Sequence, residues 1–230
     1  MGYCSWDSVV RDSAFVVVLA VTALSASCAG REVPAELVVA APLASSIPIP
    51  GQVYRETGLA SWYGREFQGR KTTSGEEFDM NGVSAAHRTL PLGTIIRVTN
   101  LDNFKSIQLR VNDRGPFVRD RILEVSYGAA RELGFVAQGI TRVNLETFEV
   151  INEPAHYTVQ AATFSEEENA WLLKERLSKK YEVISIVPYE SNLAKFYRVR
   201  VGSYASAERA EQIAGKLTLE GLEPIIVRKD

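Results

Sequence analysis

The chain has 230 residues, a formal net charge of −2 and 46% hydrophobic residues. This near-neutral balance lacks the basic surplus of nucleic-acid-binding proteins, so we expect no nucleic-acid partner. The length and hydrophobic content are sufficient for one medium-sized or two small cores.

The first recognisable segment of the chain is an uncharged apolar run over residues 14–24. It is too short to span a bilayer but has the length of the hydrophobic region of a secretory signal. Small residues at 25–27 then lead to Cys28, where bacterial lipoprotein signals place the cysteine that becomes acylated. We therefore expect residues 1–28 to be a signal peptide that ends at a lipidated Cys28. The alternative is an ordinary cleavage site with an incidental cysteine.

Cysteine usage agrees with export and lipidation. Cys4 and Cys28 are the two cysteines of the sequence, and cleavage before Cys28 would leave no disulfide partner. Ala29 and Gly30 carry no acidic retention signal, so resemblance to bacterial lipoproteins implies an anchor on the periplasmic side of the outer membrane.

The remainder divides into a tether and two globular units. Residues 29–57 contain four prolines among Ala, Val and Ser, with neither helical nor strand periodicity, which predicts an extended tether. The first unit spans 58–150, a short linker spans 151–156, and the second unit spans 157–230.

Short alternating apolar runs indicate that the first unit is mainly β. Ile95–Thr99 and Ser106–Val111 are examples, separated by Gly, Asn and Asp turns. One helix is predicted over Tyr127–Leu133, with Ser126 as its N-cap and Gly134 at its end. This pattern predicts a small closed barrel with a groove across one face.

Two acids and a histidine in this unit suit the cleavage of a glycosidic bond, which needs a proton donor and a second charge or base. Glu76 follows a loop of small residues that lets a bulky sugar approach, although Glu77 is an equal competitor on this reasoning alone. Asp113 lies in an Asn-Asp-Arg-Gly-Pro turn, where its carboxylate could instead bond the backbone. Arg114 could pair with that carboxylate or bind a sugar hydroxyl.

Three other residues leave alternatives open. His87 stands among small residues, and a lone histidine is more often structural than catalytic. Trp62 and Tyr63 could stack on a sugar or belong to the barrel core. Without a second histidine or a free cysteine nearby, zinc coordination is not expected, and we expect neither a metal nor a cofactor.

Combined motifs in this unit closely resemble the rare lipoprotein A family of septal lytic transglycosylases, which have a double-psi β-barrel. They read GLASWYG at 58–64, GEEFDM at 75–80, AAH at 85–87, LPLGT at 90–94 and RVNDRGPF at 110–117. The resemblance implies cleavage of peptide-free glycan between N-acetylmuramic acid and N-acetylglucosamine to leave a 1,6-anhydro end. It places the catalytic residues at Glu76, His87 and Asp113.

The sequence also departs from the family pattern. Glu124 stands where an aspartate is common, for example. Since related barrels perform inverting hydrolysis of cellulose, the residue types alone do not separate a lytic from a hydrolytic reaction.

The second unit contains an internal repeat at an offset of forty residues, and each half reads strand, helix, strand. Two such halves predict a ferredoxin-like βαββαβ domain with both helices on one sheet face. Period two places Gln160, Arg198 and Arg200 on the other, open face, where they would bind sugar; the alternative is a plainly solvated face. The unit resembles the sporulation-related repeat (SPOR) domain, which binds peptide-free septal glycan.

The sequence therefore predicts a mixed two-domain fold, a mainly β double-psi barrel followed by an α+β domain. The expected function is an endolytic transglycosylase, lipid-anchored in the cell envelope and enriched at the septum, with glycan strands and divisome proteins as expected partners. The alternative is a noncatalytic wall-binding protein that scaffolds or loosens the septal wall.

Overall fold

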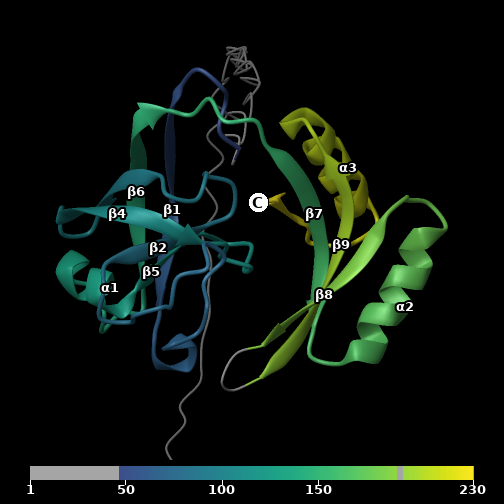
Figure 1. The fold of residues 1–230 in the computed structure, drawn as a ribbon, viewed down its shortest axis with the longest axis horizontal. Helices are drawn as coiled ribbons and strands as arrows, with labels where there is room; N and C mark the ends of the chain where they lie inside the picture. The colour runs from purple at the N-terminus through teal and green to yellow at the C-terminus, as the bar shows by residue number, and fades with distance from the viewer. Residues whose placement is uncertain (1–46, 191–193, 230) are drawn as a thin grey trace, which may run out of the picture. The chain divides into compact units, whose positions relative to one another are not determined.

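The computed structural model describes residues 47–190 and 194–229. The expected signal peptide, Cys28 and most of the expected tether lie outside these residues. The described part folds into a closed barrel of six strands and a separate four-stranded sheet (Figure 1). No helix within it is long and apolar enough to cross a membrane.

The barrel combines parallel and antiparallel pairs in the order β1-β5-β2-β4-β3-β6. Pairs β1–β5 and β2–β4 are parallel, and the other four are antiparallel. The strands are β1 (Val53–Tyr63), β2 (Ser84–His87), β3 (Ile95–Asn100), β4 (Ser106–Asp113), β5 (Arg121–Ser126) and β6 (Ile140–Val150), with a 3-10 turn at Arg65–Phe67. This closed mixed barrel confirms the predicted fold of the first unit.

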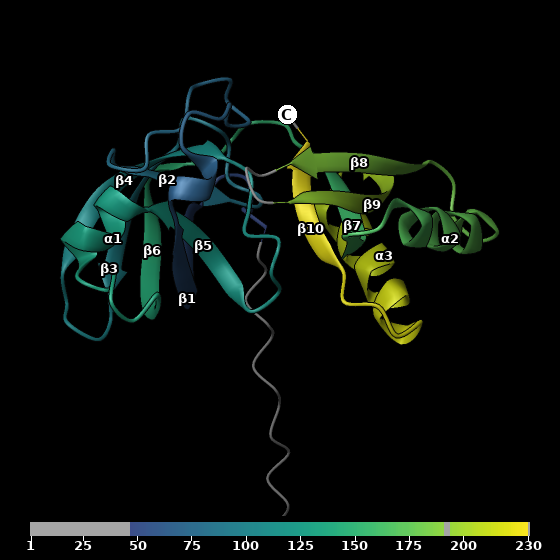
Figure 2. The same cartoon turned by 90° about the horizontal axis from the view of Figure 1, so that it is seen from below.

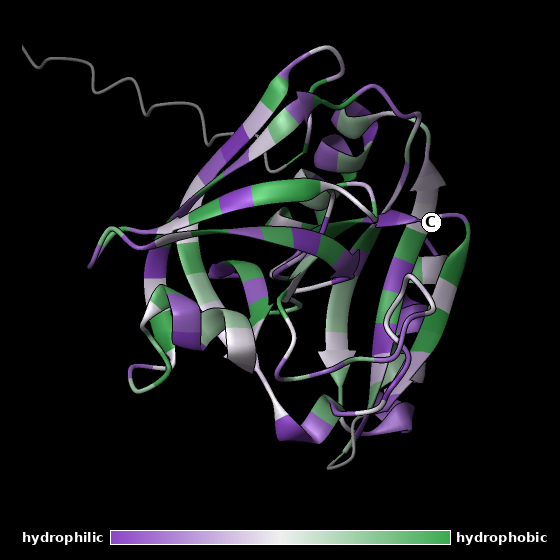
Figure 3. Ribbon diagram, turned by 60° about the vertical axis from the view of Figure 1, so that its left-hand side comes forward, coloured by the Kyte–Doolittle hydropathy of each residue, from purple (hydrophilic) through white to green (hydrophobic). Residues whose placement is uncertain are grey.

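Alternation along the strands fills the barrel. Leu109 and Val111 of β4 and Ile96 and Val98 of β3 are 0–1% exposed, while the residues between them face outward. Figure 3 shows this alternation as apolar and polar segments that follow one another along the strands. The position of a side chain in this alternation therefore decides whether it belongs to the core or to the outer face.

Helix α1 (Tyr127–Leu133) has the bounds that the sequence predicts. The Ser126 hydroxyl accepts a hydrogen bond from the Ala129 N–H, and Gly134 adopts a left-handed conformation with φ 75°. Both end signals act locally, which is why the sequence alone located them.

The expected boundary between tether and barrel at residue 57 is too late. Strand β1 begins at Val53 and its first residues pair with β6, for example Arg55 with Glu146 and Thr57 with Asn144. These residues lack a strong strand pattern, so their conformation depends on a partner that is distant in the sequence.

The second unit has the predicted ferredoxin-like topology. Its elements are β7 (His156–Phe164), α2 (Glu167–Ser178), β8 (Ile184–Glu190), β9 (Lys195–Tyr204), α3 (Ala207–Leu219) and β10 (Ile225–Lys229), with the sheet in the order β10-β7-β9-β8. Both helices cover one face of the sheet (Figure 2). Val159 and Val199 pack there against Leu177 and Leu217.

Candidate functional site

A β-bulge positions Asp113 on the outer face of the barrel. Between β2 and β4, Ala85 pairs with Val111, but Ala86 pairs with Asp113, so Asn112 is an extra residue on β4. Ala85 and Val111 belong to the barrel core. Because directly paired residues share a face, Asp113 and Ala86 point outward together. Bulges of this kind commonly redirect side chains next to active sites.

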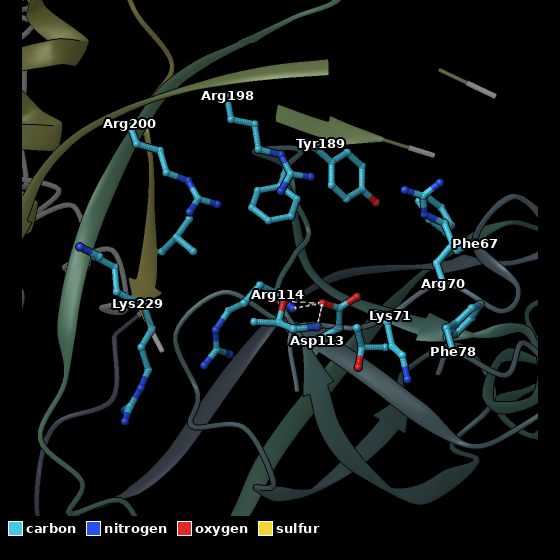
Figure 4. A pocket seen from close by; sticks show the side chains of 15 residues that line it. Phe67, Arg70, Lys71, Phe78, Asp113, Arg114, Tyr189, Arg198, Arg200 and Lys229 are labelled. Carbon is cyan, nitrogen blue, oxygen red and sulfur yellow. Dashed lines mark hydrogen bonds between the residues drawn. The ribbon is translucent and has the colours of Figure 1, made fainter. Parts of the chain in front are cut away.

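Three hydrogen bonds fix the Asp113 carboxylate, and all three reach the same oxygen. Oδ1 accepts from the Thr73 backbone N–H at 2.9 Å, the Thr73 hydroxyl at 2.7 Å and the Arg114 backbone N–H at 2.8 Å. Figure 4 shows the carboxylate in a pocket, beside Lys71. The turn bonding considered in the sequence therefore exists, and it orients the carboxylate.

Glu76 is held as an anion. The Arg110 guanidinium donates to both of its carboxylate oxygens, at 2.6 and 2.9 Å, and the Asn112 amide donates at 3.0 Å. Hydrogen bonds from Arg110 and Asn112 lower the pKa of Glu76 from 4.5 to about 2. An ionised carboxylate has no proton to donate at neutral pH, so the expected role of Glu76 as proton donor does not fit this geometry.

His87 is enclosed in the protein rather than exposed in a cleft. Its side chain is 2% exposed, its Nδ1 accepts the backbone N–H groups of Thr89 and Leu90 at 3.1 and 3.0 Å, and its Nε2 lies 3.2 Å from Glu56. Because Nδ1 is an acceptor, Nε2 must carry the proton and donate to Glu56. Burial lowers the pKa of His87, which favours this neutral form.

Glu56 completes the buried network around His87. Its Oε2 also accepts a 2.7 Å hydrogen bond from the Tyr54 hydroxyl. Burial works to raise the pKa of Glu56, but hydrogen bonds from His87 and Tyr54 outweigh it and the pKa is lowered. No sequence pattern points to Glu56, because it lies in the segment expected to be a tether.

The Arg114 side chain binds backbone carbonyl groups of a neighbouring loop. The guanidinium donates to the backbone carbonyls of His87 at 3.1 Å and Leu90 at 2.7 Å, and it is buried. In Figure 4 it points away from the Asp113 carboxylate. Arg114 therefore ties the loop after β4 to the loop after β2, and its binding of a sugar hydroxyl stays a prediction.

The two aromatic residues are structural rather than exposed sugar platforms. Trp62 packs against the barrel core and donates from Nε1 to the Val136 carbonyl at 3.3 Å. Tyr63 lies on the outer face but is 6% exposed and stacks on Phe78, with ring centroids 4.4 Å apart. Trp62 is partly buried against the barrel core, and Tyr63 supports the outer-face cluster with Phe67.

The second unit places its predicted sugar-binding residues on the sheet face opposite the helices. Gln160 pairs with Arg200 across β7 and β9, and Gln160 donates to Thr163 at 3.0 Å. The Arg198 guanidinium lies 3.7 Å from the centroid of Tyr189 on β8. Gln160 and Arg198 are 2% and 7% exposed, so the alternative of a plainly solvated face does not describe these two positions, and sugar binding there stays a prediction.

Within the described residues, no group of three or more His, Cys, Asp or Glu side chains is arranged to hold a metal ion. One acid that was not chosen from the sequence does lie on the outer face of the barrel. Glu124 on β5 is a quarter exposed, and burial raises its pKa. The sequence signal that could have found it was its substitution for a common aspartate.

Comparison with known families divides the chain in the same way as the fold. Residues 55–145 match the lytic transglycolase family model, and residues 153–228 match the SPOR domain. One solved structure, the Streptomyces papain inhibitor, aligns with a TM-score of 0.35 and 20% identity over 45% of this chain and 99% of its own.

Relatives named endolytic peptidoglycan transglycosylase RlpA match across both units. The protein from Neisseria meningitidis serogroup B is 40% identical over 69% of this chain and 70% of its own length. The Vibrio cholerae protein is 32% identical over 76% and 69%. The Pseudomonas aeruginosa PAO1 protein is 33% identical over 76% of this chain, which spans 59% of that relative's length.

Proposed function

We propose, from the premise that the chain belongs to the RlpA family, that it is an endolytic peptidoglycan transglycosylase. Its substrate would be glycan strands that have lost their stem peptides. The bond cut would join N-acetylmuramic acid to N-acetylglucosamine, and the muramyl C6 hydroxyl would close on C1 to give a 1,6-anhydro end.

The observation that carries this proposal is the oriented carboxylate of Asp113 on the outer face of the barrel. Cleavage of a glycosidic bond develops positive charge at C1, and a fixed carboxylate stabilises that charge without reorganising during the reaction. Three hydrogen bonds to Oδ1 provide the fixed orientation.

Glu76 and His87 would support Asp113 from two sides. Glu76 binds Asn112, the bulge residue that precedes Asp113. The backbone carbonyl of His87 holds the Arg114 guanidinium, and Arg114 follows Asp113. We therefore assign both residues positioning roles, in which they keep the segment from Asn112 to Arg114 in one conformation.

A noncatalytic wall-binding protein is the second candidate. The SPOR domain alone would satisfy that function. The three hydrogen bonds that orient the Asp113 carboxylate favour the enzyme, since simple adhesion requires no oriented carboxylate.

The location we propose is the cell envelope at the division septum, with the SPOR domain as the targeting module and divisome proteins as partners. Lipidation of Cys28 would anchor the chain to the periplasmic side of the outer membrane, with the residues that follow as a tether. Metabolic labelling with radioactive palmitate, compared between the parent and Cys28→Ala, tests the anchor.

Product analysis on amidase-treated sacculi tests the reaction. Mass spectrometry should find anhydro-muramyl ends with the parent protein and at least a 100-fold slower release with Asp113→Asn, which keeps the shape of the side chain. Reducing ends in place of anhydro ends would mean hydrolysis, and no cleavage by the parent would favour the wall-binding alternative.

A companion variant separates positioning from chemistry. His87→Ala leaves Glu56 and two backbone N–H groups without their partner, so it should destabilise the barrel by about 2–4 kcal/mol. Asp113→Asn should unfold close to the parent temperature. A fully stable but inactive His87→Ala variant would contradict the positioning role.

A further inference from the structure

Four residues form a row across four neighbouring strands on the outer face of the barrel. Asp113 on β4 pairs with Ala86 on β2, Ala86 pairs with Glu124 on β5, and Glu124 pairs with Ser61 on β1. Directly paired residues point to the same face of a sheet, so the two carboxyl groups face the same side. The neighbours of Glu124 on β5, Leu123 and Val125, point into the core.

Little stands between the two acids of this row. Asp113 and Glu124 are two strands apart, roughly 9.5 Å between backbones, and the residue between them contributes a single methyl group. The side chains can lean toward each other across Ala86. In glycoside-cleaving enzymes the two carboxyl groups lie about 5–9.5 Å apart. Side chains that lean toward each other from these two strands can reach a separation in that range.

The two oxygens of Glu124 have different surroundings. Oε1 lies 3.4 Å from the Ser61 hydroxyl and 3.8 Å from the Arg121 guanidinium. Oε2 faces Gly115, where an added Cβ would come within 3.2 Å of it and 3.6 Å of the Ala86 methyl group. Oε2 therefore faces the segment that follows Asp113. Because Gly115 has no side chain, it leaves the space in front of Oε2 open.

The electrostatic environment keeps a proton on Glu124 more readily than on Glu76. Burial is the main cause that raises the pKa of Glu124, and the charge of Asp113 adds to it, against opposing contributions from Arg121, Ser61 and Arg198. Glu76 is ionised by its ion pair with Arg110. The site thus needs a proton donor other than Glu76.

We infer that Glu124 is the catalytic acid of this site and donates its proton to the leaving glycosidic oxygen, while Asp113 stabilises the charge at C1. This assignment rests on the proposed glycan-cleaving function. Its geometric support is the row of paired residues from Asp113 to Ser61, which places both carboxyl groups on one face.

The reaction balances with these two carboxyl groups alone. As the bond between C1 and the leaving oxygen breaks, the leaving oxygen takes the proton of Glu124 and departs as the 4-hydroxyl of N-acetylglucosamine. The muramyl C6 hydroxyl then adds to C1 from the side that the leaving group vacated and gives its proton to the Glu124 carboxylate. The anhydro ring forms, and Glu124 is protonated again for the next cycle.

A leaving-group comparison with the full-length protein tests the assignment. Glu124→Gln should slow cleavage of peptide-free glycan by at least 100-fold, because an amide cannot donate the proton. On a 2,4-dinitrophenyl glycoside of the disaccharide N-acetylglucosaminyl-N-acetylmuramic acid, whose leaving group needs no proton, the loss should be at least tenfold smaller than on glycan, because only the later transfer of the C6 hydroxyl proton still uses Glu124. Glu124→Asp keeps the acid and should be faster on glycan than Glu124→Gln. Glu132→Gln, an exposed change on α1, is the matched control.

The outcomes separate this assignment from the proposed function. Activity of Glu124→Gln on glycan within threefold of the parent, or equal losses on both substrates, overturns the assignment of Glu124. Reducing ends from the parent overturn the transglycosylase reaction, while the leaving-group comparison still decides the proton donor. If the parent cleaves neither substrate, both proposals fail together.

Discussion

At the scale of single residues, four carboxyl groups of the barrel have four different environments. Glu76 is bound by Arg110, Glu56 is buried with His87, Asp113 is held by backbone and hydroxyl donors, and Glu124 is partly buried with its pKa raised by that burial. Only the last two face outward in one row. Residue type alone could not separate these roles, because protonation and orientation depend on neighbours from other strands.

The ion pair between Glu76 and Arg110 should make the stability of the fold depend on pH in the acidic range. Since its pKa falls from 4.5 to about 2 on folding, it contributes stability that is complete above about pH 4.5 and is lost as the pH falls toward 2. Glu76→Gln should therefore be less stable than the parent at pH 6, and the difference should shrink at pH 2.5. Urea unfolding at the two pH values measures it.

Glu77→Gln provides the control for the loss of one negative charge from the same loop. A stability difference between Glu76→Gln and the parent that grows as the pH falls would contradict the ion-pair account.

At the scale of elements, sequence reasoning worked where the signal was local. The ends of α1 followed from Ser126 and Gly134, and the strand, helix, strand repeat of the second unit followed from its periodicity. The bulge at Asn112 and the early start of β1 were missed, because both are defined by pairing with distant strands. The candidate site residues rest mainly on the family resemblance, and the roles proposed for them depend on the geometry of the barrel.

Two helical glycines test how elements pack in each unit. A Cβ on Gly128 in α1 would collide with the Asn81 carbonyl oxygen and approach the Gly82 carbonyl oxygen to 2.6 Å, whereas nothing lies within 4 Å of a Cβ on Gly215 in α3. Gly128→Ala should destabilise the protein by about 2 kcal/mol or more. Gly215→Ala should stabilise it by up to about 1 kcal/mol, as expected for an open helical position.

Thermal unfolding followed by circular dichroism measures both changes. A stabilising Gly128→Ala would mean that α1 can move away from the loop at Asn81, and the close packing of α1 on that loop would then not constrain the barrel.

At the scale of the whole molecule, the chain contains two separate hydrophobic cores. One is centred on Leu109, Val111 and Leu145 of the barrel, and the other on Val159 and Val199 of the second unit. The matching family regions also divide between the two cores. Each unit can therefore carry its own task, with the proposed cleavage in the barrel and the proposed wall binding in the SPOR domain.

Arg200 offers a test of that division of tasks. It lies on β9 two residues from Arg198, and its neighbours Val199 and Val201 belong to the core beneath the helices. Replacing its guanidinium removes donors suited to sugar hydroxyls and lactyl groups without opening that core. Arg200→Ala should therefore weaken binding to peptide-free sacculi by about 5–10-fold and leave the unfolding temperature near that of the parent.

The matched control is Arg209→Ala on α3, which removes the same charge from the helical side of the domain. Sedimentation of each variant with amidase-treated sacculi gives the bound fraction, and Arg209→Ala should bind like the parent. If Arg200→Ala sediments as fully as the parent, the sheet face is not the glycan-binding surface. Equal losses in the two arginine variants would instead indicate general charge attraction to the wall, because a specific surface must distinguish the sheet from the helices.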